Sequence, residues 1–401
     1  MVKIEKMIIN HKADCVGCYA CYNICPVNAI MMKADEEGFS YPKVDNLRCI
    51  KCEKCGTVCP SLNFVKKTSQ ADPETLAAYC LDEAVLNNSS SGGIFHLLAM
   101  KILEAGGIVI GAGFNKCWEV EHKIAENSEE LLELQTSKYV QSRIGRTFKI
   151  IKDELKTGRR VLFSGTPCQC AGLQKYLGRV YDNLLLIDFV CHGVPSPLVW
   201  QKYLKLRVKK VNEIQSISFR DKNLSWERYL LKFSLKNSNK YLADDLEHDL
   251  YLKGFLNNLY LRPSCHECKF CQKNRSVDIT LADFWGVKEE VPSMYNSNGT
   301  SLVFIHSKQG KHIFKSLPNI KLQYINFMQG IKHNPAMIKT SAASNKRQKF
   351  FRKFIIDDRQ LFNIIEQYTK PKKIVQLKMF IKRYPLVYSI IKQVKLLINS
   401  R

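Results

Sequence analysis

The chain has 401 residues, of which 45% are apolar and 24% are charged, so wholesale disorder and fibrous structure are excluded. The formal net charge is +24, but no stretch approaches eighteen uninterrupted apolar residues and the N-terminus lacks an apolar signal core, so we expect a cytoplasmic protein without a membrane-spanning helix. Sixteen cysteines in such a chain cannot form a disulfide framework, because cytosolic thiols stay reduced, and metal binding is therefore their expected role.

The N-terminal segment holds eight of these cysteines in two copies of one pattern, C-x2-C-x2-C-x3-C-P. The first run is Cys15, Cys18, Cys21 and Cys25, and the second is Cys49, Cys52, Cys55 and Cys59. In ferredoxins with this spacing, three thiolates of one run hold a [4Fe-4S] cluster and the fourth cysteine binds the other cluster. We therefore expect one cluster on Cys15, Cys18, Cys21 and Cys59, and a second on Cys49, Cys52, Cys55 and Cys25. Zinc is the alternative metal, but it pairs C-x2-C units across a longer gap.

Two short strands, 29–33 and 39–44, are predicted between the cysteine runs, joined by a turn at Glu36-Glu37-Gly38. They complete a ferredoxin-like module over residues 1–62. Residues 66–73 are polar and without periodicity, which indicates a linker that we place at 63–73.

From residue 74 onward, predicted strands alternate with helices, which implies a mainly parallel sheet. We expect helices at 94–103, 145–156 and 197–208. We expect strands at 108–110, 160–163, 184–190, 278–284 and 302–306, and an antiparallel pair at 214–219 and 229–235. The predicted fold class is thus α+β and α/β, with a two-cluster module followed by a mixed, mainly parallel α/β domain and an antiparallel extension.

Residues 326–401 form a basic tail that we expect to be helical. The segment from Lys332 onward has seventeen Lys and Arg against three acids, which accounts for +14 of the net charge. Residues 374–398 mix apolar and basic side chains, a pattern that fits a peripheral membrane surface, an acidic partner or packing on the domain itself. No recognised nucleic-acid-binding fold is present, so nucleic acid is not an expected partner.

A second group of cysteines could form a third [4Fe-4S] cluster. Cys168 and Cys191 each follow a predicted parallel strand, at the sheet edge where ligands bind in open α/β sheets. Cys265 and Cys268 lie in a loop that could fold over the same edge, with Cys271 and Cys170 as further candidates. The alternative is that Cys168 and Cys191 are buried as small apolar side chains and bind no metal.

Six strings in order resemble one known family. They are SSSGGI (89–94), SKYVQS (137–142), VLFSGTPCQ (161–169), VCHGVPSP (190–197), RPSCHECKF (262–270) and DITLADFWG (278–286). Together they resemble the beta subunits of coenzyme F420 hydrogenases and dehydrogenases, in the bacterial branch with a fused two-cluster ferredoxin module. The resemblance implies one family domain in two parts, 74–157 and 158–325, and binding of FAD. It also implies coenzyme F420 or a similar hydride carrier as substrate, and places the third cluster on Cys168, Cys191, Cys265 and Cys268. Cys170 replaces a usually aliphatic residue, and Cys271 is an additional thiol that could replace Cys268.

A flavin is also what the chemistry requires, because clusters carry single electrons whereas hydride carriers exchange two. We expect Ser90, Ser91, Gly92 and Gly93, at the start of a helix, to hold the flavin phosphate. Ser91 could instead be an ordinary N-cap. Further cofactor contacts are predicted from Lys138, Gln141 and Thr166, although Thr166 could instead cap a helix that begins at Gln169. His192 is a candidate acid, with a structural turn histidine as the alternative.

The leading hypothesis is an iron–sulfur flavoprotein oxidoreductase that exchanges electrons with a redox partner protein or a small hydride carrier. One alternative is an electron-relay subunit that serves a partner enzyme, for which the resemblance to the bacterial branch suggests surface-polysaccharide biosynthesis. Another is a zinc-bearing interaction protein.

Overall fold

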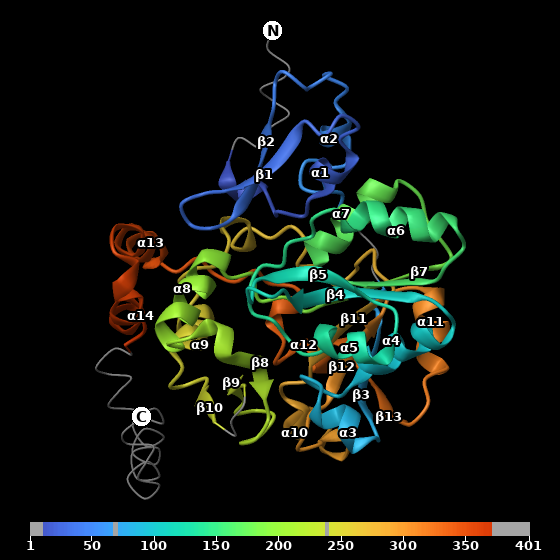
Figure 1. Ribbon diagram of the computed structural model, residues 1–401. Helices are drawn as coiled ribbons and strands as arrows, with labels where there is room; N and C mark the ends of the chain where they lie inside the picture. Colours follow the sequence, from blue (N-terminus) through green and yellow to red (C-terminus); the bar gives the residue numbers. More distant parts are fainter. Residues whose placement is uncertain (1–10, 67–70, 237–239, 371–401) are drawn as a thin grey trace, which may run out of the picture.

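The computed structural model describes residues 11–66, 71–236 and 240–370. The N-terminal module consists of η2 (Lys12–Asp14), α1 (Ala20–Ile24), β1 (Ile30–Ala34), β2 (Ser40–Val44) and α2 (Lys54–Thr57). Strands β1 and β2 form an antiparallel hairpin in which Ile30 pairs with Val44. The Asp35 carboxylate accepts hydrogen bonds from the amides of Glu37 and Phe39, which closes the turn between the strands. The module lies on top of the larger domain, next to α6 and α7 (Figure 1).

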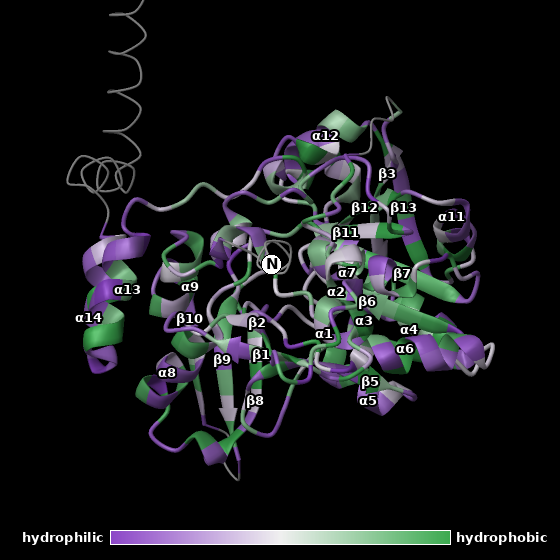
Figure 2. Cartoon of the chain, turned by 90° about the horizontal axis from the view of Figure 1, so that it is seen from above, coloured by the Kyte–Doolittle hydropathy of each residue, from purple (hydrophilic) through white to green (hydrophobic). Residues whose placement is uncertain are grey.

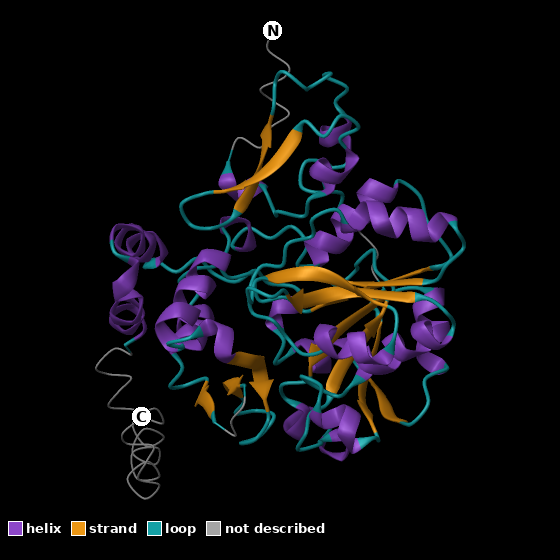
Figure 3. Ribbon diagram, viewed as in Figure 1, coloured by secondary structure: helices purple, strands orange, loops and turns teal. Residues whose placement is uncertain are grey.

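An eight-stranded sheet forms the centre of the larger domain (Figure 3). Its order is β13-β3-β12-β11-β7-β6-β4-β5. The strands are β3 (Glu74–Cys80), β4 (Ile108–Phe114), β5 (Val120–Ala125), β6 (Val161–Ser164), β7 (Leu184–Phe189), β11 (Ile279–Asp283), β12 (Ser301–Ile305) and β13 (Ile320–Ile325). The four central strands β4, β6, β7 and β11 run parallel, and the strands on either side of them join antiparallel. The carboxyl ends of the central strands therefore share one edge of the sheet.

Helices cover both faces of this sheet because its strands alternate buried apolar residues between them. In β7, Leu184 and Leu186 pack beneath α6 (Thr147–Lys156) and α7 (Pro167–Leu177), whereas Leu185 and Ile187 pack on the opposite face. The opposite face is covered by α4 (Ile94–Glu104), α5 (Ser128–Leu134) and α11 (Lys308–Lys315). In Figure 2 the strands are mostly hydrophobic, while α6 shows hydrophilic residues on its surface. Residues of α1 join the core under α6 and α7, so the two domains share one apolar layer.

A third region packs beside the sheet. Its strands β8 (Ile214–Asp221), β9 (Leu230–Leu235) and β10 (Tyr241–Asp245) are antiparallel. Its helices are α8 (Pro197–Arg207), α9 (Leu250–Leu256), α13 (Arg347–Ile356) and α14 (Leu361–Thr369). They enclose Trp200, which is fully buried among aromatic rings. The short helices α3 (Glu83–Asn87), α10 (Val287–Glu290) and α12 (Phe327–Ile331) complete the described elements, together with the 3-10 turns η3 (Val211–Glu213), η4 (Pro263–Cys265), η5 (Pro292–Met294), η6 (Pro335–Met337) and η7 (Asp358–Gln360).

The predicted fold class is confirmed, and each predicted helix and strand has a counterpart. Strand β4 extends to Phe114, well past the predicted end at residue 110, because β5 pairs with that extension. Strands β3, β5, β10 and β13 had no predicted counterpart. In the described ranges no helix is long and apolar enough to span a bilayer. The described part of the basic tail forms α12, α13 and α14, whereas residues 374–398 lie outside the described residues.

Candidate cofactor cavity and cysteine sets

The first cysteine set lines a small hollow in the N-terminal module. Its members are Cys15, Cys18, Cys21 and Cys59, the four residues predicted to share a cluster. Gly17 and Tyr19 adopt left-handed φ values of 66° and 65° and bend the chain around the hollow. Left-handed residues of this kind turn backbone N–H groups toward a bound anion. The four sulfur donors and the bent loop fit a [4Fe-4S] cluster.

The second cysteine set repeats this local geometry nearer the surface. Lys51 and Glu53 have φ values of 56° and 58°, at the positions equivalent to Gly17 and Tyr19. Cys25 is buried, Cys49 and Cys55 pack against it, and Cys52 is exposed. The four cysteines therefore come together as predicted and suit a second cluster of the same type.

The third cysteine set is assembled from three distant segments. Cys168 lies in the first turn of α7, Cys191 follows β7, and Cys265 and Cys268 lie in and after η4. These four thiols are close enough for their charges to interact: burial raises the pKa of Cys168 to about 12, with further contributions from Cys268 and Cys265. The Cys271 thiol hydrogen-bonds to Cys268, so both remain candidate ligands.

Cys170 does not join this set. Its thiol is fully buried and points to the carbonyl oxygens of Gly165 and Ile187, at 3.7 and 3.5 Å. It therefore fills the apolar core beneath α7, which removes it from the ligand candidates.

Helix α7 links the first and third sets. Gly172 lies one helical turn after Cys168, on the same face of the helix. A Cβ atom at Gly172 would lie 2.8 Å from the sulfur of Cys18, so the absence of a side chain allows the module to pack this closely. The two sets therefore contact the same face of one helix.

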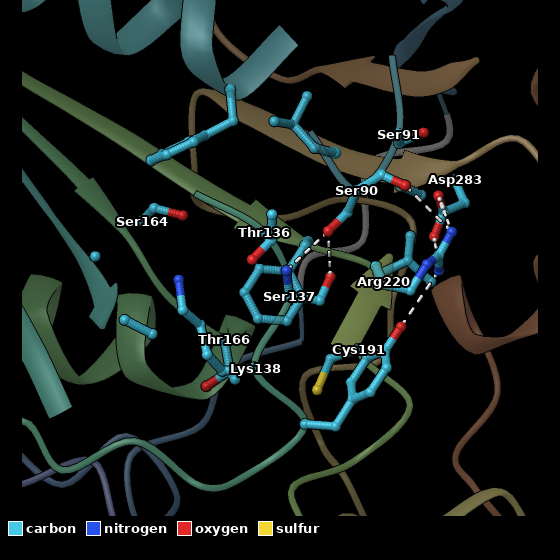
Figure 4. A pocket seen from close by; sticks show the side chains of 18 of the residues that line it. Ser90, Ser91, Thr136, Ser137, Lys138, Ser164, Thr166, Cys191, Arg220 and Asp283 are labelled. Atoms are coloured by element: carbon cyan, nitrogen blue, oxygen red, sulfur yellow. Dashed lines mark hydrogen bonds and ion pairs between the residues drawn. The ribbon is translucent and has the colours of Figure 1, made fainter. Parts of the chain in front are cut away.

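A cavity of about 490 Å³ opens at the carboxyl edge of the parallel strands (Figure 4). It is lined by residues at or just after the ends of β6, β7 and β11, among them Thr166, Cys191 and Asp283. The first residues of α4 and the segment from Thr136 to Val140 close its other side. Cys191 lines the cavity and also belongs to the third cysteine set.

Five of the predicted cofactor residues line this cavity, namely Ser90, Ser91, Gly93, Lys138 and Thr166. The side chain of Ser90 accepts a hydrogen bond from the Ser137 amide at 2.8 Å. Gly93 is the N-cap of α4 with a φ of 79°. Ser91 is therefore not the N-cap, and its hydroxyl bonds to the carbonyl of Thr300 instead.

Two predicted cofactor residues lie elsewhere. The amide of Gly92 donates to the Ser301 hydroxyl, and a Cβ atom there would lie 2.5 Å from the carbonyl oxygen of Ala78. Gly92 thus allows two strands and a loop to pack closely. Gln141 bonds to Arg262 and to the carbonyl of Val16, because its side chain points to the N-terminal module rather than into the cavity.

Thr166 is the N-cap of α7, which begins at Pro167 rather than at Gln169. Thr166 and Gln169 form a capping box, which fixes the first turn of the helix. The Thr166 hydroxyl also lies 3.1 Å from the sulfur of Cys168. It therefore both lines the cavity and contacts the third cysteine set.

Burial shifts the pKa values of several groups at the cavity. Desolvation lowers the pKa of Lys138 to about 7, although its ammonium donates to the Glu133 and Gln135 carbonyls. Desolvation likewise lowers the pKa of His122 to about 4, and that of His192 below its usual value. His192 lines the cavity, and its Nε2 lies 2.7 Å from the Asn258 side chain.

One charged pair at the cavity was not predicted from the sequence. Arg220 binds both carboxylate oxygens of Asp283 at 3.0 and 3.1 Å (Figure 4). The Trp226 indole also donates to Asp283, and the Trp226 and Trp285 rings stack at 5.2 Å. Asp283 and Trp285 stand in the DITLADFWG string, whereas nothing in the sequence around Arg220 marks it.

Comparison with known proteins identifies both parts of the chain. Residues 158–327 match the family described as the C terminus of the beta subunit of coenzyme F420 hydrogenase/dehydrogenase, and residues 14–63 match the 4Fe-4S dicluster domain. The F subunit of the F(420)H(2) dehydrogenase from Methanosarcina mazei is 22% identical over 325 residues, which cover 77% of this chain and 83% of that protein. A subunit of the NADH-quinone oxidoreductase from Geobacter metallireducens is 40% identical over 73 residues, 17% of this chain and 55% of that one.

A solved structure of the F420-reducing [NiFe] hydrogenase complex from Methanosarcina barkeri contains a similar chain. It has 17% identity and a TM-score of 0.45, covering 72% of this chain and 95% of the other. The resemblance predicted from the six strings and the cysteine runs is confirmed by the two family matches. The protein therefore joins an iron–sulfur 4Fe-4S dicluster domain to a C-terminal domain of the coenzyme F420 hydrogenase/dehydrogenase beta-subunit family.

Proposed function

We propose that this protein is an iron–sulfur flavoprotein oxidoreductase with three [4Fe-4S] clusters and one FAD. It passes electrons between a one-electron partner and a hydride carrier, for which coenzyme F420 is the first candidate. The relationship to F420 hydrogenase and dehydrogenase beta subunits supports an electron-transfer oxidoreductase. The remaining parts of the proposal depend on the cavity and on the third cysteine set.

The observation that carries the proposal is the position of Cys191, which belongs to the third cysteine set and also lines the cavity. A cofactor in this cavity would lie next to a cluster bound by Cys191. Single electrons could then move between cluster and cofactor without a further carrier. An isolated metal site, or an isolated ligand pocket, would not need this shared residue.

The cavity has features that suit a flavin with an anionic phosphate group. Its volume falls within the usual range for cofactor sites. The N-terminus of α4, an eleven-residue helix, borders it and favours an anion. Lys138 suits an anionic ligand, because a bound anion would favour the protonated ammonium form that desolvation disfavours. Aromatic rings of Tyr229 and Trp285 supply flat apolar surface.

In the overall reaction, one molecule of the hydride carrier is oxidised and two molecules of the one-electron partner are reduced. Reduced coenzyme F420 loses a hydride and a proton, which together are two electrons and two protons. Both protons pass to solvent, and the electrons leave singly to two equivalents of the one-electron partner. In the opposite direction the same groups reduce the carrier.

The test is a single anaerobic preparation of the whole chain. We expect about twelve iron atoms per chain, as three four-iron clusters require, and one releasable FAD. The preparation should oxidise reduced coenzyme F420 and reduce two equivalents of a one-electron dye. In Cys191→Ala the iron content should fall by about four atoms per chain, whereas the exposed Cys117→Ala is the matched control and should retain all of it.

Other outcomes would replace the proposal. Full iron and FAD without oxidation of the carrier would make the chain an electron-relay subunit of a larger enzyme. Zinc in place of iron would leave only an interaction protein.

A further inference from the structure

Among the residues that the structure describes, three arginines are buried, and Arg262 is the most deeply buried of them. It is 0% exposed, compared with 3% for Arg220 and 5% for Arg275. Arg220 pairs with Asp283 and Arg275 with Asp188, as expected for guanidinium groups removed from water. In the part of the chain that the structure describes, the hydrogen bonds of Arg262 go only to neutral oxygen atoms. Its charge therefore has no protein counter-charge in contact.

The neutral partners of Arg262 belong to the N-terminal module and to Gln141. Nε donates to the Cys15 carbonyl at 2.7 Å, Nη2 to the Ser40 carbonyl at 3.0 Å, and Nη1 to the Gln141 side chain at 2.9 Å. The Tyr41 ring lies 4.3 Å from the guanidinium carbon. A Cβ atom at Gly17, inside the first cysteine run, would lie 2.9 Å from Nη1. The guanidinium thus contacts the loop that bends around the first cysteine set.

The same residue also faces the third cysteine set. The carbonyl of Arg262 accepts a hydrogen bond from the Cys265 amide at 2.9 Å. Its positive charge also opposes the rise in pKa that burial causes at the Cys168 and Cys265 thiols. Arg262 therefore contacts the loop of the first cysteine set through its guanidinium and the third set through its backbone carbonyl.

Burying a cation without an opposite charge beside it costs desolvation free energy, and a nearby anion offsets that cost. A [4Fe-4S] cluster held by four thiolates is anionic and gains another negative charge on reduction. We propose that Arg262 is the shared counter-charge of the first and third clusters and that it favours the reduced state of both. It is a positioning residue that acts on the two clusters by its charge. The inference rests on the three-cluster arrangement of the proposed function.

The test uses Gln141→Glu, which places a carboxylate of nearly the same shape on Nη1 and loses only the hydrogen bond to Val16. The measurement is the midpoint potential of each cluster in the holoprotein, by redox titration followed by paramagnetic resonance. We expect two of the three clusters to become harder to reduce, each by at least tenfold in the one-electron equilibrium, which is 59 mV. Gln201→Glu on α8 is the matched control and should leave all three potentials unchanged.

A second pair of variants separates charge from shape. Arg262→Gln should shift the same two potentials in the same direction, whereas Arg262→Lys, which keeps the charge, should stay closer to the wild type. A purely structural Arg262 would make Arg262→Lys as damaging as Arg262→Gln and leave the Gln141→Glu potentials unchanged. Unshifted potentials in Gln141→Glu with full iron would overturn the role of Arg262. A wild-type iron content of only about eight atoms per chain would overturn the three-cluster proposal itself, and this inference with it.

Discussion

The two cysteine sets of the N-terminal module share a backbone geometry but differ in their surroundings. In the first set, Cys15 and Cys18 are 5% and 7% exposed, because α7 and Arg262 pack against them. The second set includes the exposed Cys52 and lies beside Leu47 and Ile50, which are 99% and 60% exposed. The second set includes the most exposed of these cysteines, Cys52, and is therefore the better placed to meet a partner in solution, whereas Cys15 and Cys18 of the first set contact the larger domain.

The strongest challenge to this comparison is the loss of a ligand from the buried set. We expect Cys18→Ser to impair the first cluster and to slow electron transfer between an external carrier and the cavity by more than about 100-fold. The electron paramagnetic resonance signal of the second cluster should remain. Transfer at the wild-type rate would show that electrons bypass the first set.

Filling the contact at α7 should have the next largest effect. In Gly172→Val the new side chain would collide with Cys18, so we expect a loss of about 1–3 kcal/mol in the free energy of unfolding and slower transfer between the module and the domain. Gly111→Ala is the control, because a Cβ atom there has no neighbour nearer than 3.7 Å. Equal stability of the two variants in denaturant titrations would contradict the close packing.

The exposed end can be tested without touching a cluster ligand. The double variant Leu47→Asp/Ile50→Asp should slow electron exchange with a carrier protein by about fivefold, because a protein partner must bury these side chains. A small dye, which needs no such surface, should react at the wild-type rate. If both carriers slow equally, the change has damaged the cluster rather than a docking surface.

A change of pH should act at the cavity and spare both ferredoxin sets. Because the pKa of Lys138 in the folded chain is about 7, an anionic cofactor should bind about twofold more weakly at pH 7.5 than at pH 7. The unfolded chain binds the proton more tightly, so the empty protein should gain stability as the pH rises from 7 toward 10. Titration calorimetry should detect proton uptake on binding at pH 8, and Lys138→Met should abolish it.

The sequence predicted features made of neighbouring residues better than features made of residues that are far apart along the chain. The ferredoxin sets are local: three cysteines of each set lie within seven residues, so their spacing alone predicted the grouping. For the third set, the shared edge of the parallel strands predicted that Cys168 and Cys191 lie close together, and the family resemblance implied that Cys265 and Cys268 complete the set. Gln141 was misplaced because the direction of one side chain in an extended segment depends on what packs on each side. The pairing of Arg220 with Asp283 joins residues more than sixty positions apart and leaves no local pattern.

Gly172 and Cys168 lie on one face of one helix, and this has a consequence for protein engineering. The N-terminal module cannot be replaced by another ferredoxin merely because the two share a cysteine motif. A foreign ferredoxin grafted in its place would have to reproduce the close approach at Gly172 and offer carbonyl oxygens to Arg262. Chimeras designed only on the cysteine motif should therefore bind iron yet remain electrically isolated from the rest of the molecule.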